Sequence, residues 1–342
     1  MMSIEIVHEL SENEWRCFVE SHPAGNIFHT PEMFQVFSHT KGYRPELWAA
    51  IKSERILALL LPVQITLKDG LLRPLSTRAV AYGSVLSVPT NEGRDALAVL
   101  LRSYTHEVKG SPLFTKLRNI SDLSDTQPVL NECGFSFQQY ANYLIDLEQS
   151  EETVWRRLSK KTRQHVQRAR DSCLIIEEMT EASKLAVAYQ LLRQVYARVH
   201  VPLASITMFQ AALDILVAQN MLKIVTARVG ERYIGVNFVL TFKGQVIDWY
   251  RGSDRGFSSY YPEPMMIWHL LQWSIQHGFR CFDFGGAGRP EEDYGPRIFK
   301  SRWGGALVNY GRNTYVHAPI RLKLSGVGYK ITRKSIMNIM SE

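Results

Sequence analysis

The sequence predicts an α/β protein built of two domains. The chain has 342 residues, and a single hydrophobic core usually stops growing at about 250–300 residues. Segments with strand-like and helix-like patterns are mixed along both halves. The composition changes abruptly after Asp146-Leu147, where the charged segment EQSEETVWRRLSKKTRQHVQRARDS begins. We therefore expect an N-terminal domain over residues 1–148 and a C-terminal domain over residues 149–342, the latter with a basic entry helix and a basic tail.

In the first half, apolar runs predict several strands and one long helix. The runs ELWAAI and RILALLLPVQITL are predicted strands, with a turn at residues 52–54 between them. PLFTKLRNI and YANYLIDL are two further predicted buried strands. DALAVLLRSYTHEV places its apolar residues at helical spacing, which predicts an amphipathic helix.

The second half has a clearer order of elements. Two amphipathic helices, SKLAVAYQLLRQVYARV and ITMFQAALDILVAQN, precede three strands, LKIVTARV, YIGVNFVLTF and QVIDWYRG. Hairpin turns are expected at residues 230–231 and 243–244. A helix follows in PEPMMIWHLLQWSIQH, where prolines near the start are tolerated. The strand RCFDF and a late strand, VNYGRNTYV, complete the domain.

The composition is that of an ordinary folded protein. Hydrophobic residues make up 45% and charged residues 21%. The four cysteines are scattered, and no paired-cysteine or HExxH motif predicts a metal site. The N-terminus lacks an apolar signal core, and no apolar run is long enough to span a bilayer. We therefore expect a cytoplasmic protein without a metal, and the net charge of +7 is compatible with an anionic partner.

The order of elements in the second half resembles the acyltransferase fold of the GNAT superfamily. The motifs resemble those of the FemABX family of aminoacyl transferases and its acyltransferase relatives. They are NIFHTPEMFQVF, LRN, YLIDL, LLRQVYARVHVPL, DWYRGS and the block FDFGGAG…GPRIFKSRWGG. The resemblance covers nearly the whole chain and implies two tandem GNAT-like domains with mixed sheets. Family members that act in cell-wall synthesis insert a helical coiled-coil arm, and this sequence has no room for a long one.

The block at residues 282–305 carries the main candidate site. In the strand FDF the two phenylalanines share one face and Asp283 takes the other. One interpretation is a tight turn beside the core, with Asp283 capping a backbone amide. The other is the wall of a ligand channel, with Asp283 and the backbone at Gly285 and Gly286 close to substrate. Two arginines would then bind anionic groups, Arg289 and Arg297.

The resemblance implies that Phe299 and Lys300 lie in the transfer site. Both are candidate catalytic residues. Lys300 would stabilise negative charge on the acyl carbonyl or hold an anionic substrate group. The simpler alternative is a solvated surface lysine, which a strand position between apolar neighbours disfavours. The resemblance also implies that His29 and Lys41 lie in the segment that lines the acceptor pocket, and we include Lys41 among the substrate-binding residues.

The segment Tyr250-Arg251-Gly252-Ser253 ends the three-strand meander and precedes a helix. In GNAT enzymes a cofactor pyrophosphate meets helix amides at this place. We assign Tyr250 and Arg251 to substrate binding. Asp254 stands where the acetyl-CoA pattern R/Q-x-x-G-x-G/A has its first glycine, and a carboxylate repels a pyrophosphate. This departure disfavours coenzyme A and favours an aminoacyl-tRNA donor.

The basic entry helix WRRLSKKTRQHVQRAR has an apolar seam and a cationic remainder. A charge run of this kind is often only a solvated face. The alternative is a surface that follows phosphates, for tRNA or for a lipid-diphosphate precursor at an anionic membrane. The candidate phosphate-binding residues are Arg156, Arg157, Lys160, Lys161 and Arg163.

These features predict an acyltransferase that moves an aminoacyl group from aminoacyl-tRNA to an amine of a peptidoglycan or other cell-envelope precursor. The alternatives are an acyl-CoA-dependent N-acyltransferase for an amino sugar or polysaccharide precursor, and a non-catalytic protein that binds nucleic acid or the envelope. No bound cofactor is expected, because the aminoacyl-tRNA, or acyl-CoA in the alternative, is a substrate. The basic tail also predicts peripheral contact with an anionic membrane at its cytoplasmic face.

Overall fold

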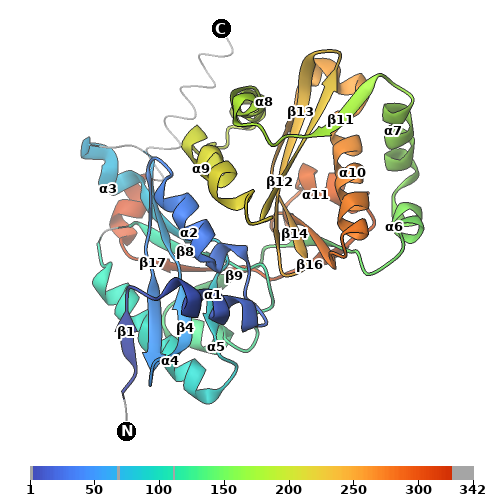
Figure 1. The fold of residues 1–342 in the computed structure, drawn as a ribbon. Coiled ribbons are helices and arrows are strands. Elements are labelled where there is room, and N and C mark those ends of the chain that lie inside the picture. The colour runs from blue at the N-terminus through green and yellow to red at the C-terminus, as the bar shows by residue number, and fades with distance from the viewer. Residues whose placement is uncertain (1–2, 68–69, 111, 326–342) are drawn as a thin grey trace. The chain divides into compact units, whose positions relative to one another are not determined.

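The structure is a computed structural model that describes residues 3–67, 70–110 and 112–325. The chain forms two compact units (Figure 1). Unit 1 comprises the described parts of Met1–Ser38, Gly42–Gln138 and Gly311–Glu342. Unit 2 comprises His39–Lys41 and Gln139–Tyr310.

Unit 1 contains a four-stranded and a six-stranded sheet. Their strand orders are β1-β3-β4-β7 and β2-β5-β6-β8-β17-β9, and only β6 and β8 pair in parallel. The strands are β1 (Glu5–Val7), β2 (Tyr43–Pro45), β3 (Trp48–Lys52), β4 (Arg55–Leu60), β5 (Val63–Thr66), β6 (Thr77–Ala81), β7 (Val85–Ser87), β8 (Phe114–Arg118), β9 (Ser136–Gln138) and β17 (Arg312–Val316). The helices are α1 (Glu12–Ser21), η1 (Ile27–His29), α2 (Pro31–Ser38), η2 (Gly70–Leu72), α3 (Arg73–Ser76), α4 (Asn91–Glu107) and α5 (Gln127–Glu132).

The core of unit 1 forms where α4 packs against β3, β4 and β7. Leu97, Leu101 and Tyr104 of α4 are buried there with Trp48 and Leu60. The predicted strand RILALLLPVQITL is divided at Leu61-Pro62, so that β4 and β5 belong to different sheets. A proline lacks the N–H that a continuous ladder needs, which explains the break.

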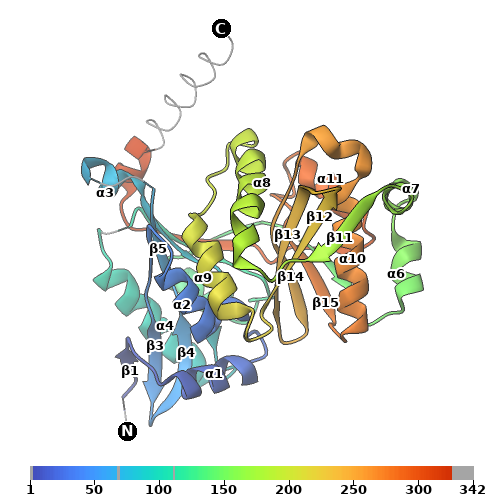
Figure 2. The same cartoon turned by 45° about the horizontal axis from the view of Figure 1, so that its top comes forward.

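Unit 2 is built on one seven-stranded sheet of order β11-β12-β13-β14-β15-β10-β16. Its strands are β10 (Asn142–Asp146), β11 (Leu174–Glu178), β12 (Leu222–Val229), β13 (Arg232–Phe242), β14 (Gln245–Ser253), β15 (Cys281–Gly286) and β16 (Ala306–Val308). Its helices are α6 (Glu151–Arg157), α7 (Lys160–Arg170), η3 (Ala182–Lys184), α8 (Leu185–Arg198), α9 (Ile206–Leu216), η4 (Arg255–Tyr260), α10 (Pro262–Gln276) and α11 (Gly295–Ser301). Helix α10 covers one face of the sheet, and α8 and α9 cover the other (Figures 1 and 2). The predicted hairpins at residues 230–231 and 243–244 are both present.

The structure divides the chain at different residues from the predicted boundary at 148. Strand β10 precedes that boundary, yet it lies between β15 and β16 in the sheet of unit 2. Strand β17 lies late in the chain and completes the six-stranded sheet of unit 1. A strand belongs to the sheet in which its backbone finds partners, and its own sequence does not specify those partners. Residues 326–342, which hold most of the predicted basic tail, lie outside the described residues.

Candidate functional site

The candidate site in unit 2 lies where β14 and β15 diverge. The two strands pair in parallel only from Gln245↔Cys281 to Ile247↔Asp283. Beyond that point β14 continues to Ser253 along β13, while β15 continues to Gly286 along β10. The two strands therefore separate after Ile247 and Asp283, and we call the space between them the wedge. The polar residues that follow the last paired positions lie beside this wedge.

A β-bulge in β14 places two of these polar residues on the same face. The register with β13 passes from Phe238↔Tyr250 to Val239↔Asp248, which leaves Trp249 as the extra residue. In a regular strand, the side chains of residues three apart point to opposite faces of the sheet. The extra residue of a bulge brings such a pair onto the same face. Asp248 and Arg251 consequently meet, with Arg251 Nη1 2.6 Å from Asp248 Oδ2.

Arg251 connects this bulge to the helices that follow. Its Nε lies 3.9 Å from a carboxylate oxygen of Glu263 in the first turn of α10. Its guanidinium lies 5.2 Å from the ring centroid of Phe299 on α11. The Asp248 side chain is 7% exposed and that of Arg251 16%, so the pair is largely removed from water. Arg251 is thus fixed by protein contacts, and it keeps Phe299 beside the wedge.

Asp283 is buried on β15, as the FDF pattern predicts. The rings of Phe282 and Phe284 pack 5.0 Å apart on the core side of the strand. The Asp283 carboxylate accepts hydrogen bonds from the Gly285 N–H at 2.6 Å and from the Asn142 side chain at 3.2 Å. Burial raises the pKa of Asp283 to about 6, against the opposing effects of the Gly285 hydrogen bond and of Lys300.

Lys300 lies on helix α11, which corrects the expectation that it lies on a strand. It is only 8% exposed, which also excludes the alternative of a solvated surface lysine. Its ammonium donates to the carbonyl oxygens of Phe284, Gly285 and Gly286 at 2.5, 3.2 and 2.8 Å. An ammonium has three donors, so these bonds occupy all of them. Burial lowers the pKa of Lys300 to about 8, although Asp248 acts in the opposite direction.

The two buried groups Asp283 and Lys300 and the largely buried pair Asp248 and Arg251 form what we call the charged cluster. Lys300 interacts electrostatically with the other three, and the two acids balance the two bases. The contacts of Lys300 make it a positioning group for the end of β15. Its predicted direct contact with substrate stays a prediction, because the ammonium must leave a carbonyl to make one.

The small residues at the end of β15 and just after it allow other parts of the protein to approach closely. Gly285 has φ of +68° and Gly288 +79°, a backbone region that favours glycine. A Cβ at Gly286 would lie 2.7 Å from the ring of Tyr140, and one at Gly288 would lie 2.8 Å from that of Tyr294. Two tyrosine rings therefore account for the close approach at Gly286 and Gly288, and substrate contact at Gly285 and Gly286 stays a prediction.

The arginines predicted to bind anions in this block have protein partners. Arg297 donates to the carbonyl oxygens of Ala287 and Pro290 at 2.8 and 3.0 Å, and also to that of Arg289. These bonds hold the loop that follows β15. Arg289 forms an exposed ion pair with Glu292, 3.6 Å away. Arg297 is therefore a loop-fixing residue, and its predicted role as an anion ligand is not supported by its contacts.

Tyr250 and Lys41 are two further predicted substrate-binding residues, and neither belongs to the charged cluster. Tyr250 packs its ring 5.6 Å from that of Tyr196 on α8 and 4.9 Å from that of Phe209 on α9. It therefore lies on the sheet face that α8 and α9 cover. Lys41 is exposed, and its backbone N–H donates to Thr207 Oγ1 at 2.9 Å. This contact uses the backbone of Lys41 and says nothing about its ammonium group. Binding of the acceptor by Lys41 therefore stays a prediction.

Asp248 and Glu263 are site residues that the sequence analysis missed. Asp248 is the only acid in the run QVIDWYRG, and an acid within an apolar strand is a usable signal. Its partnership with Arg251 depends on the bulge at Trp249, which no local pattern marks. Glu263 lies between two prolines at the start of α10.

The N-terminus of α10 is poorly suited to a pyrophosphate. Pro262 and Pro264 have no N–H to donate, and the carboxylate of Glu263 accepts a hydrogen bond from Ser253 at 2.7 Å. In the preceding turn, Asp254 accepts from the Gly256 N–H at 2.9 Å and pairs with Arg232. Two amides of the first turn of α10 are thus missing, and the Gly256 amide is already bonded to a carboxylate, which disfavours a diphosphate at this place.

The predicted basic entry helix is two helices. Leu158 and Ser159 have extended backbone angles between α6 and α7, and the Ser159 hydroxyl accepts from the Thr162 N–H at 3.1 Å. Arg163 donates through Nη1 to the carbonyl oxygens of Arg156 and Leu158, and phosphate binding by Arg163 stays a prediction. The other four predicted phosphate-binding residues are exposed: Arg156, Arg157, Lys160 and Lys161.

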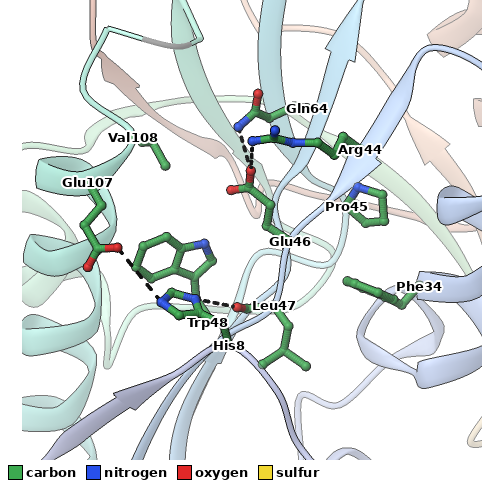
Figure 3. Close-up of a pocket in the computed structure, with 10 residues that line it drawn as sticks. All are labelled: His8, Phe34, Arg44, Pro45, Glu46, Leu47, Trp48, Gln64, Glu107 and Val108. Atoms are coloured by element: carbon green, nitrogen blue, oxygen red, sulfur yellow. Dashed lines mark hydrogen bonds and ion pairs between the residues drawn. The ribbon is translucent and has the colours of Figure 1, made fainter.

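Unit 1 contains a separate pocket of about 460 Å³ (Figure 3). His8 packs edge-on against Trp48, with ring centroids 4.3 Å apart, and lies 3.9 Å from Glu107. Glu46 is already bonded by Arg44 and Gln64 at 2.5 and 2.8 Å. The pocket is lined by none of the predicted site residues, and the Glu46 carboxylate in it already has partners within the protein.

We expect the charged cluster to give the unfolding free energy a minimum between about pH 6 and pH 8. The pKa of Asp283 is raised from 3.8 to about 6, so the folded chain binds more protons in that window and loses stability as pH rises through it. The pKa of Lys300 is lowered from 10.5 to about 8, so stability is regained as pH rises through that window. Urea unfolding across this pH range, compared with an Asp283→Asn/Lys300→Met double variant, measures the effect. A difference between the two proteins that does not change with pH would contradict it.

Comparison with known proteins identifies the fold. Residues 156–295 match the family described as an acetyltransferase (GNAT) domain. A crystal structure of FemX is similar with a TM-score of 0.71 and 14% identity, covering 94% of this chain and 99% of that one. The structure of L-PGS from Bacillus licheniformis has a TM-score of 0.59 and 13% identity, covering 93% and 96% of the two chains. A tandem GNAT protein from the clavulanic acid biosynthesis pathway has a TM-score of 0.58 and 11% identity, covering 92% and 99%.

A search of curated protein sequences returned no significant match. Among residues 3–67, 70–110 and 112–325, none of the helices combines the length and hydrophobicity that a bilayer crossing requires. The helices and strands described above include no long coiled-coil arm. The chain therefore has the tandem GNAT fold of the FemX structure, and residues 156–295 are its matched acetyltransferase (GNAT) domain.

Proposed function

We propose that the chain is an N-acyltransferase that moves an aminoacyl group from aminoacyl-tRNA to an amine of a peptidoglycan or other cell-envelope precursor. The observation that carries this choice of donor is the segment from Asp254 to the first turn of α10, where two carboxylates, Asp254 and Glu263, and two prolines stand where a pyrophosphate would need N–H donors. The names of the similar structures, FemX and L-PGS, agree with aminoacyl transfer.

The chemistry that fits the wedge is direct attack of the acceptor amine on the activated ester. The nearest thiol, Cys281, is a poor nucleophile because burial, with Asp283 and Asp146, raises its pKa to about 12. An aminoacyl ester is already activated, so holding the two substrates in place supplies much of the rate. The cations Arg251 and Lys300 lie beside the wedge, where they would stabilise negative charge that develops on the ester carbonyl.

Donor competition tests this proposal directly. The purified chain is incubated with a panel of envelope precursors and either labelled aminoacyl-tRNA or labelled acyl-CoA, at equal concentration. We expect label to reach the acceptor amine only from the charged tRNA. Transfer from acyl-CoA at an equal or higher rate would reject the tRNA donor and support the CoA-dependent alternative, and no transfer from either donor would favour a binding protein.

We expect acetyl-CoA and longer acyl-CoAs to bind poorly. The turn at Asp254 and the first turn of α10 offer carboxylates where a pyrophosphate needs N–H donors. Calorimetric titration with coenzyme A should show no affinity in the low-micromolar range, about −8 kcal/mol. An affinity that tight would contradict this expectation and support the acyl-CoA-dependent alternative.

We expect the exposed cations of α6 and α7 to contact the phosphates of tRNA. Neutralising Arg156, Arg157, Lys160 and Lys161 should weaken tRNA binding and flatten the log–log salt dependence by about 0.7 for each lost single-stranded contact. Arg94→Gln/Arg102→Gln, which removes exposed charges from α4, is the control. Equal salt slopes for the four-residue variant and the native chain would mean that this face is only solvated.

A further inference from the structure

Two short segments of unit 1 leave the six-stranded sheet at the same end: residues 70–76, which form η2 and α3, and the helical residues 319–325. The first leads directly into β6 and the second follows β17, and these two strands flank β8. Leu113, just before β8, donates its N–H to the Thr77 carbonyl at 2.9 Å, and its own carbonyl accepts from the two residues that follow β17. The two segments, which we call the paired segments, therefore lie side by side, as Figures 1 and 2 show.

The paired segments expose large apolar side chains. Leu71 is 98% exposed and Ile320 75%, and Leu72 and Leu324 are exposed as well. Ile320 and Leu324 share one face of their helix because they are four residues apart. Leu67 follows β5, which pairs with β6, and it is also exposed at this end of the sheet. Single exposed apolar residues are ordinary, but a group of them on neighbouring segments marks an interaction surface.

The exposed charges beside these apolar side chains are positive. Arg73 of α3 and Lys323 are exposed, and the paired segments contain no aspartate or glutamate. The dipeptide at 68–69, a lysine and an aspartate, lies outside the described residues and adds no net charge. Arg321 donates to the Gly110 carbonyl, so it fastens the second segment to unit 1 and is not counted with the exposed cations. The surface therefore combines apolar side chains with positive charge.

We propose that the paired segments dock on an anionic lipid membrane, with their leucine and isoleucine side chains between the headgroups and Arg73 and Lys323 beside the lipid phosphates. Apolar side chains and cations are interspersed in both segments, as Leu-Leu-Arg and Ile-Arg-Leu-Lys-Leu, which is typical of a segment that lies in the membrane interface. Apolar side chains are stabilised by leaving water, and an anionic leaflet attracts cations without requiring them at fixed positions. The membrane contact expected from the basic tail did not include η2 and α3. The surface lies in unit 1, and its docking does not depend on the transfer reaction.

Flotation of the full chain with lipid vesicles tests this surface. We expect the chain to bind vesicles of equal parts phosphatidylglycerol and phosphatidylcholine, and to bind vesicles of phosphatidylcholine alone much less. Leu71→Ser/Leu72→Ser should weaken binding to the anionic vesicles about tenfold or more, because two apolar side chains no longer leave water. Arg73→Gln/Lys323→Gln should weaken it about fivefold for each lost charge, and added salt should reduce that difference.

Val199→Ser/Val201→Ser is the matched control, because these two valines are exposed to a similar extent as Leu72 and Leu324 but lie in unit 2. This variant should bind vesicles as the native chain does. All three variants retain residues 326–342, so equal binding by the native chain and by both paired-segment variants would assign the contact to another part of the chain and overturn the proposal. Absence of native binding to the anionic vesicles would overturn it as well.

Hydrogen exchange on the native chain avoids the risk that a variant fails to fold. Backbone amides of the paired segments should exchange more slowly on anionic vesicles, whereas those of α10 should be unchanged. Equal exchange with and without vesicles would count against the surface. A native chain that is dimeric without lipid, and monomeric as Leu71→Ser/Leu72→Ser, would identify a second copy as the occupant and overturn the membrane proposal. Because no donor or acceptor is present, these results stand whether or not the transfer reaction is observed.

Discussion

Replacing Lys300 by methionine is expected to lower the turnover of the transfer reaction by about 10²–10³, the loss that follows removal of one oxyanion-stabilising donor. The ammonium is the cation nearest the end of β15, and its three hydrogen bonds fix the carbonyl groups of Phe284, Gly285 and Gly286. Methionine retains much of the length and volume of the lysine stem, so packing beside Phe299 is preserved. The variant therefore removes the charge and its bonds with little change in shape.

The same substitution is also expected to lower the unfolding free energy. Carbonyl groups that lose a buried partner cost about 1–3 kcal/mol each, less where water enters. Asp283 would also lose the nearby positive charge that opposes the effect of its burial. Urea unfolding of the native chain and of Lys300→Met, at pH 7, measures this cost.

A double variant separates the chemical role of Lys300 from its structural role. Asp283→Asn/Lys300→Met removes both buried charges, so it should recover the part of the stability that is lost when Asp283 is left without nearby positive charge, while the three carbonyl groups stay unpaired. If Lys300 stabilises the transition state, kcat should stay low in this variant although part of the stability returns. A rise in KM with unchanged kcat would instead indicate that Lys300 only holds a ground-state anion. A Lys300→Met protein with native kinetics would refute its assignment to the site.

Features set by local pattern could be predicted from the sequence. The alternation in FDF correctly predicts that Phe282 and Phe284 share the core side of β15 and that Asp283 faces away from them. The helical spacing in DALAVLLRSYTHEV corresponds to α4. The helical position of Lys300 also had a signal, because Gly295-Pro296 places a proline at the start of α11, where helices accept one.

Features set by distant partners could not be predicted in this way. Nothing in β17 or β10 marks which sheet each strand joins, because pairing depends on the backbone edge that the rest of the fold leaves open. The bulge at Trp249 is likewise invisible in the run QVIDWYRG, and it decides that Asp248 and Arg251 share a face. The charged cluster was therefore only partly predicted from the sequence: Arg251, Asp283 and Lys300 were separate candidates, and Asp248 was not among them.

Replacing Arg251 by glutamine is expected to cost about 3–5 kcal/mol of unfolding free energy, the usual effect of leaving one member of a buried ion pair alone. The Asp248 side chain, only 7% exposed, would lose the partner that lies 2.6 Å away. Phe299 would lose the guanidinium that lies 5.2 Å from its ring. Activity should fall as well, since Phe299 and Lys300 are neighbours on α11.

Arg232→Gln is the matched control for this variant. Arg232 lies on β13, next to β14, and forms an ion pair of similar length with Asp254, 2.9 Å, but its side chain is 64% exposed. An exposed pair contributes only about 0–1 kcal/mol, so this variant should unfold almost as the native chain does. The variant Asp248→Asn/Arg251→Gln should recover part of the lost stability, because no buried charge is then left alone. If Arg251→Gln and Arg232→Gln unfold at the same urea concentration, the bulge at Trp249 does not create a buried ion pair, and the charged cluster as described is wrong.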